Sequence, residues 1–193
     1  MSNLPIGIFL AAGQSRRFGA NKLLHPVLDD TPMLIVSART LASVLPDSIV
    51  VINQELAAYT TQLEDLGLKV VINEYSKTGI GSSISCGIRA SEKAHEYISG
   101  WLIALADMPY IKPETISLLA EKIRNGADIV APVFEQQRGH PVGFSHRYLS
   151  ELIALGEDIG ARNIINSHQN NLELVTVSDE GVLKDIDYVS ELA

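Results

Sequence analysis

The sequence has little that would place the protein in a membrane or an oxidising compartment. A single cysteine, Cys86, stands among the 193 residues, so no disulfide can form within the chain. No apolar run approaches the roughly 18 residues of a membrane span. Residues 1–5 carry no basic segment ahead of an apolar stretch, as a signal peptide would. We therefore expect a cytoplasmic protein without a membrane partner.

The sequence also lacks an excess of positive charge. Its 15 Lys and Arg residues stand against 23 Asp and Glu, for a formal net charge of -8. This balance excludes general nucleic-acid binding, which uses a basic face. It still permits binding of a small anionic ligand, because a few cationic side chains at the site outweigh the repulsion from negative charges elsewhere on the protein. No linker, repeat or low-complexity tract interrupts the chain, which predicts one domain over residues 1–193.

Two common phosphate-binding motifs are absent. There is no Walker A loop, because Lys22 follows Gly19 only after two intervening residues, and there is no G-x-G-x-x-G, which argues against a dinucleotide-dependent oxidoreductase. A different loop is present at residues 10–22, directly after the apolar run 4–9. It offers two glycines for close backbone approach, and it offers polar and basic side chains for phosphate: Ser15, Arg16, Arg17 and Lys22. These features predict a nucleoside triphosphate site.

Apolar runs alternate with helical patterns along the chain. We predict strands at residues 6–10, 48–52, 69–72, 101–106 and 128–133, and helices at residues 33–43, 55–66, 82–95 and 113–124. Near-continuous apolar strands are typical of parallel sheets buried on both faces. The pattern predicts an α/β fold, a three-layer α/β/α sandwich with a mainly parallel, Rossmann-like sheet. In such sheets ligands bind beyond the carboxyl ends of the strands.

The loop resembles a known family signature. Residues 10–22 match L-x-A-G-x-S-x-R-F-G-x-x-K of the MobA/MocA-like nucleotidyltransferases, and the chain is most similar to the molybdenum cofactor cytidylyltransferase branch. The resemblance implies a nucleotide-diphospho-sugar transferase-like fold. It implies catalytic roles for Arg17 and Lys22 at the leaving phosphates. It also implies nucleotide contacts from Leu10, Ala11, Ala12, Gly13, Ser15, Arg16 and Lys22.

Two acidic residues are candidates for a metal site. Asp107 ends the apolar run 101–106, and a carboxylate at the end of a buried strand suits Mg²⁺. Asp185 and Asp187 share one face of any extended segment, with Asp185 expected to be solvated. The resemblance maps Asp107 and Asp187 onto the acids of the family, although Tyr188 replaces the usual small hydroxyl. The alternative for Asp187 is a cap on a last helical turn at residues 189–192.

A Gly/Ser turn at residues 79–88 is predicted to lie beside the base. The resemblance places a similar G-x-G-x-S-x-x-x-G segment there in the family, with contacts expected from Gly79, Ser82 and Ser83. Asn53 and Asn73 follow the second and third predicted strands and face the same way, so they are expected to contact the base or the ribose. A helix cap at Ser82 or Ser83, and turn-forming roles for the two asparagines, remain open alternatives. The cytidylyl branch resembles L-A-A-G and the guanylyl branch L-A-G-G. The methyl group of Ala12 then favours CTP over GTP by narrowing the space beside the base.

Two later segments also match the family. Residues 139–144 resemble G-H-P-V-x-F of the cytidylyl branch, and residues 158–162 resemble its D-x-G-A-R. We expect Arg138, His140 and Arg162 to form a cationic wall for a pterin phosphate. For His140 alone, a packed histidine bonded to backbone is the alternative.

The combined hypothesis is a Mg²⁺-dependent transfer of CMP from CTP to the terminal phosphate of molybdopterin, with release of pyrophosphate. No protein nucleophile is required, because positioning and electrostatics carry such transfers. The alternatives are a guanylyltransferase of the same cofactor using GTP, a sugar-1-phosphate nucleotidyltransferase, and a carrier of the molybdenum cofactor without transfer activity. A recipient molybdoenzyme is an expected partner.

Overall fold

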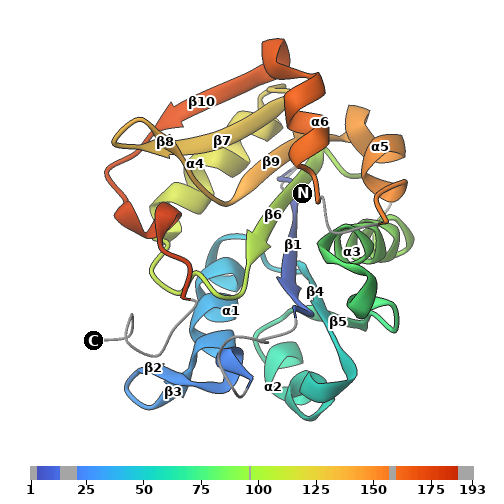
Figure 1. Ribbon diagram of the computed structural model, residues 1–193, viewed down its shortest axis with the longest axis vertical. Coiled ribbons are helices and arrows are strands. Elements are labelled where there is room, and N and C mark those ends of the chain that lie inside the picture. Colours follow the sequence, from blue (N-terminus) through green and yellow to red (C-terminus); the bar gives the residue numbers. More distant parts are fainter. Residues whose placement is uncertain (1–3, 14–20, 96, 157–159, 187–193) are drawn as a thin grey trace.

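The computed structural model describes residues 4–13, 21–95, 97–156 and 160–186. Its centre is an eight-stranded sheet in the order β10-β7-β9-β6-β1-β4-β5, with β8 paired to β7 (Figure 1). The strands are β1 (Ile6–Ala11), β4 (Ile49–Ile52), β5 (Lys69–Ile72), β6 (Gly100–Leu105), β7 (Ile129–Phe134), β8 (Gln137–Arg138), β9 (Val142–Ser145) and β10 (Leu172–Thr176). Strand β9 runs antiparallel to both β6 and β7, and β8 antiparallel to β7, whereas the other pairs are parallel. A short ribbon of β2 (Pro26–Leu28) and β3 (Thr31–Pro32) stands apart from the sheet.

Helices cover both faces of the sheet. One face carries α1 (Met33–Val44), α2 (Thr60–Glu64) and α4 (Pro113–Arg124), and the other carries α3 (Ile80–Ala94), α5 (Leu149–Ile153) and α6 (Arg162–Ser167). Short 3₁₀ segments connect them: η1 (Lys22–Leu24), η2 (Gln54–Tyr59), η3 (Ser76–Thr78), η4 (His146–Tyr148), η5 (Gln169–Asn171) and η6 (Glu180–Leu183). The predicted three-layer sandwich with a mainly parallel sheet is confirmed.

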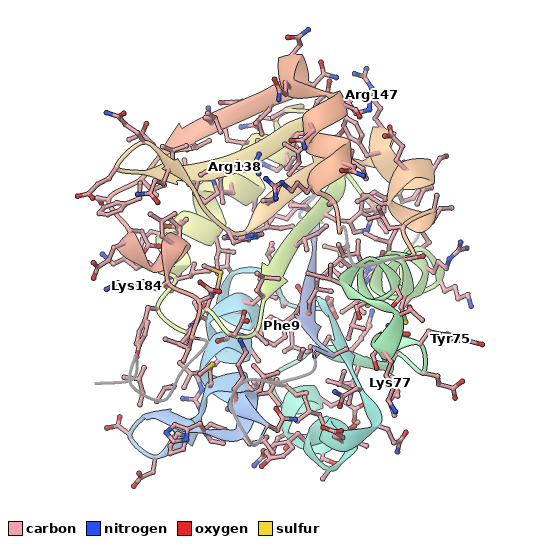
Figure 2. The ribbon with its side chains drawn as sticks, in the orientation of Figure 1. Phe9, Tyr75, Lys77, Arg138, Arg147 and Lys184 are labelled. Atoms are coloured by element: carbon pink, nitrogen blue, oxygen red, sulfur yellow. The ribbon has the colours of Figure 1, made fainter. Side chains whose placement is uncertain are left out.

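Strand β1 shows why the sheet is buried on both faces. Phe9 and Ala11 pack toward α1, whereas Ile8 and Leu10 pack toward α3, because successive side chains of a strand point to opposite faces. Figure 2 shows Phe9 near the centre of the molecule, and Tyr75 and Lys77 at the surface beside the start of α3. A strand that buries side chains on both faces must be apolar throughout, which is the pattern that predicted it.

The predicted elements agree with the structure except in a few places. The five predicted strands and the helix at 113–124 form, with ends shifted by no more than a residue or two. The single helix predicted at 55–66 is wrong, because the chain forms η2 and then the short α2. The alternative of a helix cap at Ser82 or Ser83 is also wrong: α3 begins at Ile80, after Gly79 at φ 127°, so both serines lie in its first turn.

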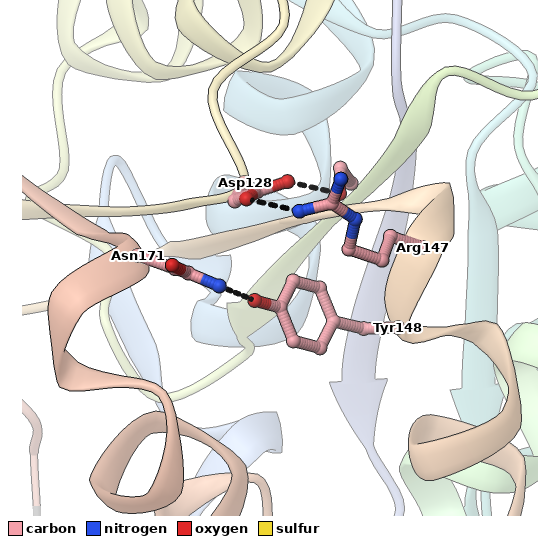
Figure 3. A network of polar contacts seen from close by, with 5 residues as sticks. Asp128, Arg147, Tyr148 and Asn171 are labelled. Atoms are coloured by element: carbon pink, nitrogen blue, oxygen red, sulfur yellow. Dashed lines mark hydrogen bonds and ion pairs between the residues drawn. The ribbon is translucent and has the colours of Figure 1, made fainter.

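A polar network closes the end of the sheet opposite the carboxyl ends of its parallel strands. Asp128, just before β7, accepts hydrogen bonds from Arg147 at 2.7 Å and from the Ser145 hydroxyl at 3.4 Å (Figure 3). Asn171 donates to the Tyr148 hydroxyl at 2.9 Å. These bonds join β7, β9, η4 and η5 at this end of the sheet. Among the residues described, no helix has the length and apolar character needed to cross a membrane.

Candidate active site

The sheet changes its winding direction between β1 and β6. The chain passes from β1 outward to β4 and β5, and then returns to β6 on the other side of β1. Such a reversal leaves a crevice beyond the carboxyl ends of the two central strands, where open α/β sheets bind their ligands. The described start of the signature loop, from Leu10 to Gly13, leaves β1 at this point.

Lys22 and Asp107 meet at this crevice. The Lys22 Nζ lies 2.8 Å from Asp107 Oδ2, and their side chains are 15% and 24% exposed. Lys22 opens η1, whose next residue, Leu23, is buried in the core on the α1 face. The side chain of Asn21 accepts a hydrogen bond from the Leu23 amide and caps this turn. Burial of Leu23 therefore anchors the short segment that presents Lys22.

The backbone at Asp107 is fixed from three directions. The Ala106 amide donates to Leu10 O at 3.1 Å, and the Ser37 hydroxyl donates to Ala106 O at 2.9 Å. The Ile186 amide donates to Asp107 O at 2.9 Å, which brings a distant part of the chain against this loop. The carboxylate therefore stands on a rigid base, as a group that must hold a metal or a phosphate requires.

Four of the predicted site residues lie outside the described part of the chain: Ser15, Arg16, Arg17 and Asp187. The motif acid Asp158 and the helical turn expected at residues 189–192 lie outside it as well. Among the described residues, no group of three or more His, Cys, Asp or Glu side chains is placed to hold a metal ion. The Asp107 carboxylate still fits Mg²⁺, which is commonly held by one or two carboxylates together with substrate phosphates and water. A cationic Lys22 already lies against that carboxylate, so the position attracts positive charge.

The asparagines after β4 and β5 make bonds within the protein. Asn53 caps η2 by accepting from the Leu56 amide at 3.3 Å, and its Nδ2 lies 3.5 Å from Ala12 O. Asn73 Nδ2 donates to the hydroxyls of Ser82 at 3.0 Å and Ser83 at 3.1 Å, while its Oδ1 accepts from the Tyr75 amide. The turn-forming roles left open for the asparagines are thus present. Asn73 also ties the end of β5 to the start of α3.

Ala12 is more deeply buried than the proposed steric selection of CTP requires, since that selection needs the Ala12 methyl group to face the base. The residue is 1% exposed and packs in the core on the α3 face with residues of β1 and α3. Its methyl group has almost no surface to offer a bound base. Any effect of Ala12 on base choice must therefore act through the backbone of the loop that follows it.

A cavity of about 250 Å³ opens on the α3 and α6 face of the sheet. Its walls are largely apolar and come from α3, β6, β9 and α6, and its polar groups come from β8, from the connection between β8 and β9, and from the start of α6. The lining residues are Ile80, Ile84, Ile103, Leu105, Arg138, Gly139, His140, Val142, Phe144, Ala161, Arg162 and Ile165. The structure thus brings together Arg138, His140 and Arg162, which sequence reasoning had grouped as one wall.

The cavity adjoins the Lys22–Asp107 pair. Leu105 lines it, and Asp107 follows two residues later along the same chain. The Asp107 carboxylate also acts electrostatically on His140. Burial lowers the pKa of His140 below its ordinary value, and Arg138 adds to this, whereas the carboxylates of Asp107 and Asp185 oppose it. The His140 ring is therefore mainly neutral at pH 7, and the positive charge of the wall comes from Arg138 and Arg162.

Sequence reasoning missed two parts of this region. The first is the set of apolar wall residues, such as Ile103 and Phe144. In the sequence they look like any other apolar residues of a strand, so nothing marks them as lining a cavity. Asp179 is 2% exposed and accepts three hydrogen bonds beside the site. The one available signal was Gly181 two residues after it, a spacing typical of a side-chain-stabilised turn.

The Nδ1 atom of His140 is buried, and it has no hydrogen-bond partner among the described residues. Buried polar atoms are nearly always paired, so this nitrogen is an exception, and as a buried atom it is not itself exposed in the cavity that His140 lines. The backbone amide of the same residue donates to Val182 O at 2.9 Å. The alternative of a packed histidine bonded to backbone is therefore met by the His140 amide. The ring Nδ1 makes no hydrogen bond to the described residues.

Comparison with known proteins finds relatives that match most of the chain. The chain is 30% identical over 198 residues to the purine catabolism protein PucB of Bacillus subtilis, covering 96% of this chain and 93% of the relative. It is 28% identical over 174 residues to a molybdenum cofactor guanylyltransferase of Desulfosudis oleivorans, covering 90% and 81%. The crystal structure of Rv0371c from Mycobacterium tuberculosis shares the fold, with a TM-score of 0.84 at 23% identity, covering 99% and 96%. A second structure of Rv0371c, in complex with manganese, has a TM-score of 0.69 at 20% identity, covering 90% and 88%.

The sequence matches the MobA-like NTP transferase domain over residues 7–172, from β1 into β10. This span includes Lys22, Asp107 and every residue that lines the cavity. The chain belongs to the family of MobA-like NTP transferase domains and is a nucleotidyltransferase.

Proposed function

We propose that this nucleotidyltransferase transfers CMP from CTP to the terminal phosphate of molybdopterin or the molybdenum cofactor. The observation that carries the proposal is that the Lys22–Asp107 pair adjoins a cavity with apolar walls and two arginines. One side of this arrangement suits a triphosphate and the other suits a ring system that bears a phosphate. The acceptor is supported by the relative named molybdenum cofactor guanylyltransferase.

The nucleotide side uses the residues at the ends of β1 and β6. Asp107, with Asp187 as the second acid, would hold Mg²⁺, which when bound neutralises triphosphate oxygens and orients the α-phosphorus. Lys22 then pairs with the β- and γ-phosphates, since its ammonium is already held at the carboxylate that faces them. We assign Arg17 the same role. Backbone amides of the signature loop, with Ser15 and Arg16, bind the remaining phosphate oxygens.

The acceptor side uses the cavity. Arg138 and Arg162 bind the acceptor phosphate, because guanidinium groups match phosphate oxygens in pairs. The isoleucine, leucine and phenylalanine walls cover the apolar surface of the ring system. A phosphate oxygen of the acceptor attacks the α-phosphorus, the bond to the bridging oxygen breaks, and pyrophosphate leaves. The neutral His140 lines the same cavity and is expected to pack against the acceptor.

The base is bound at the ends of β4 and β5 and the start of α3. There Asn73 bonds Ser82 and Ser83 near Gly79 at the start of α3, and Asn53 follows the neighbouring strand β4. The Leu10-Ala11-Ala12-Gly13 sequence supports CTP. GTP is the second candidate, because one relative is named molybdenum cofactor guanylyltransferase and because the Ala12 methyl group is buried.

Thermal unfolding with Mg²⁺ and each of CTP, GTP, ATP and UTP tests the nucleotide half. A ligand at about 100 times its dissociation constant adds about 2.7 kcal/mol to the free energy of unfolding. We expect that shift with CTP alone. A shift with GTP alone would replace the cytidylyl proposal by its guanylyl alternative. No shift with any nucleotide, with Mg²⁺ and acceptor both present, would favour a carrier of the cofactor.

The same proposal includes one domain over residues 1–193, action in the cytoplasm, and delivery of the product to a recipient molybdoenzyme. Delivery is tested by mixing the loaded protein with a cofactor-free molybdoenzyme and measuring recovery of that enzyme's activity. Recovery should exceed that obtained with the free product at equal concentration. Equal recovery from free product would remove the recipient from the proposal.

A further inference from the structure

Asp179 is a buried carboxylate whose two oxygens are fully engaged. Its Oδ2 accepts from the Lys112 amide at 2.9 Å and from the Thr115 hydroxyl at 2.7 Å, and its Oδ1 accepts from the Gly181 amide at 3.1 Å. A charge that is 2% exposed is tolerated only when several donors surround it. These bonds fasten the beginning of one segment, residues 179–186, to the beginning of α4. We call this segment the C-terminal strap; it contains η6, drawn in red beside the start of α4 in Figure 1.

The strap contacts the loop that carries Asp107. The Ile186 amide donates to Asp107 O at 2.9 Å, and Ile186 itself is buried. Gly181 lies so close to this loop that a Cβ atom at its position would stand 2.2 Å from Tyr110 O. The backbone from Asp107 to Tyr110 is therefore held by the strap at both ends.

The strap also contacts the β8–β9 connection, which carries His140. Val182 O accepts from the His140 amide at 2.9 Å, and Val182 is completely buried. A Cβ atom at Gly139 would stand 2.2 Å from the same Val182 oxygen, so only glycine permits this approach. One short segment thus touches the backbone of the metal acid and the backbone of the acceptor cavity.

We propose that Asp179 is a positioning residue that, through the C-terminal strap, fixes the distance between Asp107 and the His140 side of the cavity. The proposal rests on the proposed function, in which these two places hold the two substrates. Transfer requires the acceptor oxygen to lie in line with the α-phosphorus, and errors of about 1 Å cost of the order of a hundredfold in rate. Asp179 touches neither substrate, so its effect appears in alignment and in acceptor binding and leaves nucleotide binding unchanged.

Three variants of the full chain separate this role from a general loss of stability. Asp179→Asn keeps the shape and weakens the buried bonds, and Thr115→Val removes one donor to Asp179 while keeping the side-chain volume. Ser48→Ala is the control: Ser48 is equally buried, and its hydroxyl accepts from the Gly7 amide and donates to Leu45 O, at the other end of β1 and away from the strap. All three are compared well below their unfolding temperatures.

The first readout is amide hydrogen exchange, which needs no turnover. In Asp179→Asn, and to a smaller degree in Thr115→Val, exchange at Ile186 and at His140 should accelerate together, by about tenfold or more in Asp179→Asn. In Ser48→Ala both amides should exchange as in the wild type. Unchanged exchange at either amide in Asp179→Asn would overturn the proposal.

The second readout is steady-state kinetics with Mg²⁺, CTP or GTP, and the acceptor. We expect kcat to fall about tenfold or more in Asp179→Asn and KM for the acceptor to rise, with KM for the nucleotide within about threefold of wild type. Ser48→Ala should match the wild type in all three constants. Equal losses in Asp179→Asn and Ser48→Ala would reduce Asp179 to a structural role. Wild-type protein without transfer activity would contradict the proposed function and the kinetic consequence, while the exchange result would still decide whether the strap links the two loops.

Discussion

At the scale of single residues, the Lys22–Asp107 pair matters for chemistry more than for stability. Both side chains are partly exposed, and ion pairs of this kind contribute about 1 kcal/mol or less to folding. Asp107 was recognisable from its place after an apolar strand, and Lys22 from the signature loop. The contact between them could not be predicted from the sequence. The elements β4, β5 and α3 all lie between the two residues along the chain, and only the strand order brings Lys22 and Asp107 together. Ser15, Arg16, Arg17 and Asp187 remain predictions.

His140 provides a prediction about pH. Its pKa is lowered in the folded protein, chiefly by burial, so the unfolded chain binds a proton first as the pH falls. The contribution of the neutral His140 ring to the free energy of unfolding is therefore fully present above about pH 6.5, and it is lost progressively below that value. The free energy of unfolding in urea should be lower at about pH 5.5 than at about pH 8, with the loss concentrated below about pH 6.5, and His140→Gln should remove part of that loss. A difference between wild type and variant that is independent of pH would contradict this assignment.

At the scale of elements, the sequence predicts what is locally repetitive and misses what depends on neighbours. The apolar strands β1, β4 and β6 were recognisable because each buries both faces. Strand β9 was not, because it is short, contains Gly143 and gains its pairing from β6 and β7, which lie elsewhere in the sequence. The short helices α5 and α6 are likewise stabilised by packing Leu152, Ile164 and Ile165 on the sheet, which no local pattern predicts.

The junction between β5 and α3 depends on one side chain. Asn73 is 4% exposed and bonds Ser82, Ser83 and the Tyr75 amide, so Asn73→Ala removes one partner from the buried Ser83 hydroxyl and from two partly buried polar groups. We expect a loss of about 1–3 kcal/mol in the free energy of unfolding, measured by urea denaturation. Asn53→Ala, which removes the cap of η2 and the long contact to Ala12 O, is the matched variant and should cost about 1 kcal/mol. A smaller loss for Asn73→Ala than for Asn53→Ala would contradict this view of the junction.

At the scale of the whole molecule, an acidic protein presents a local cationic site. The formal net charge is -8, yet Arg138 and Arg162 meet in one cavity beside Lys22. The three-layer fold and the crevice at the strand ends could be predicted from the alternation of apolar runs and helical patterns. The cavity could not, because its walls come from four elements that are remote in the sequence. The strap could not either, since its role depends on backbone contacts to Asp107 and His140.

Pyrophosphate release tests the central claim most directly. Wild-type protein, Mg²⁺, molybdopterin and each of the four nucleoside triphosphates are combined, and pyrophosphate and the nucleotidyl product are measured together. We predict one pyrophosphate per product with CTP, and loss of both in Lys22→Ala, which should unfold at nearly the wild-type temperature because the ion pair adds little stability. Release that requires the acceptor but survives in Lys22→Ala would contradict the mechanism. Folded wild-type protein that gives no product with any nucleotide would contradict the proposed transfer to molybdopterin.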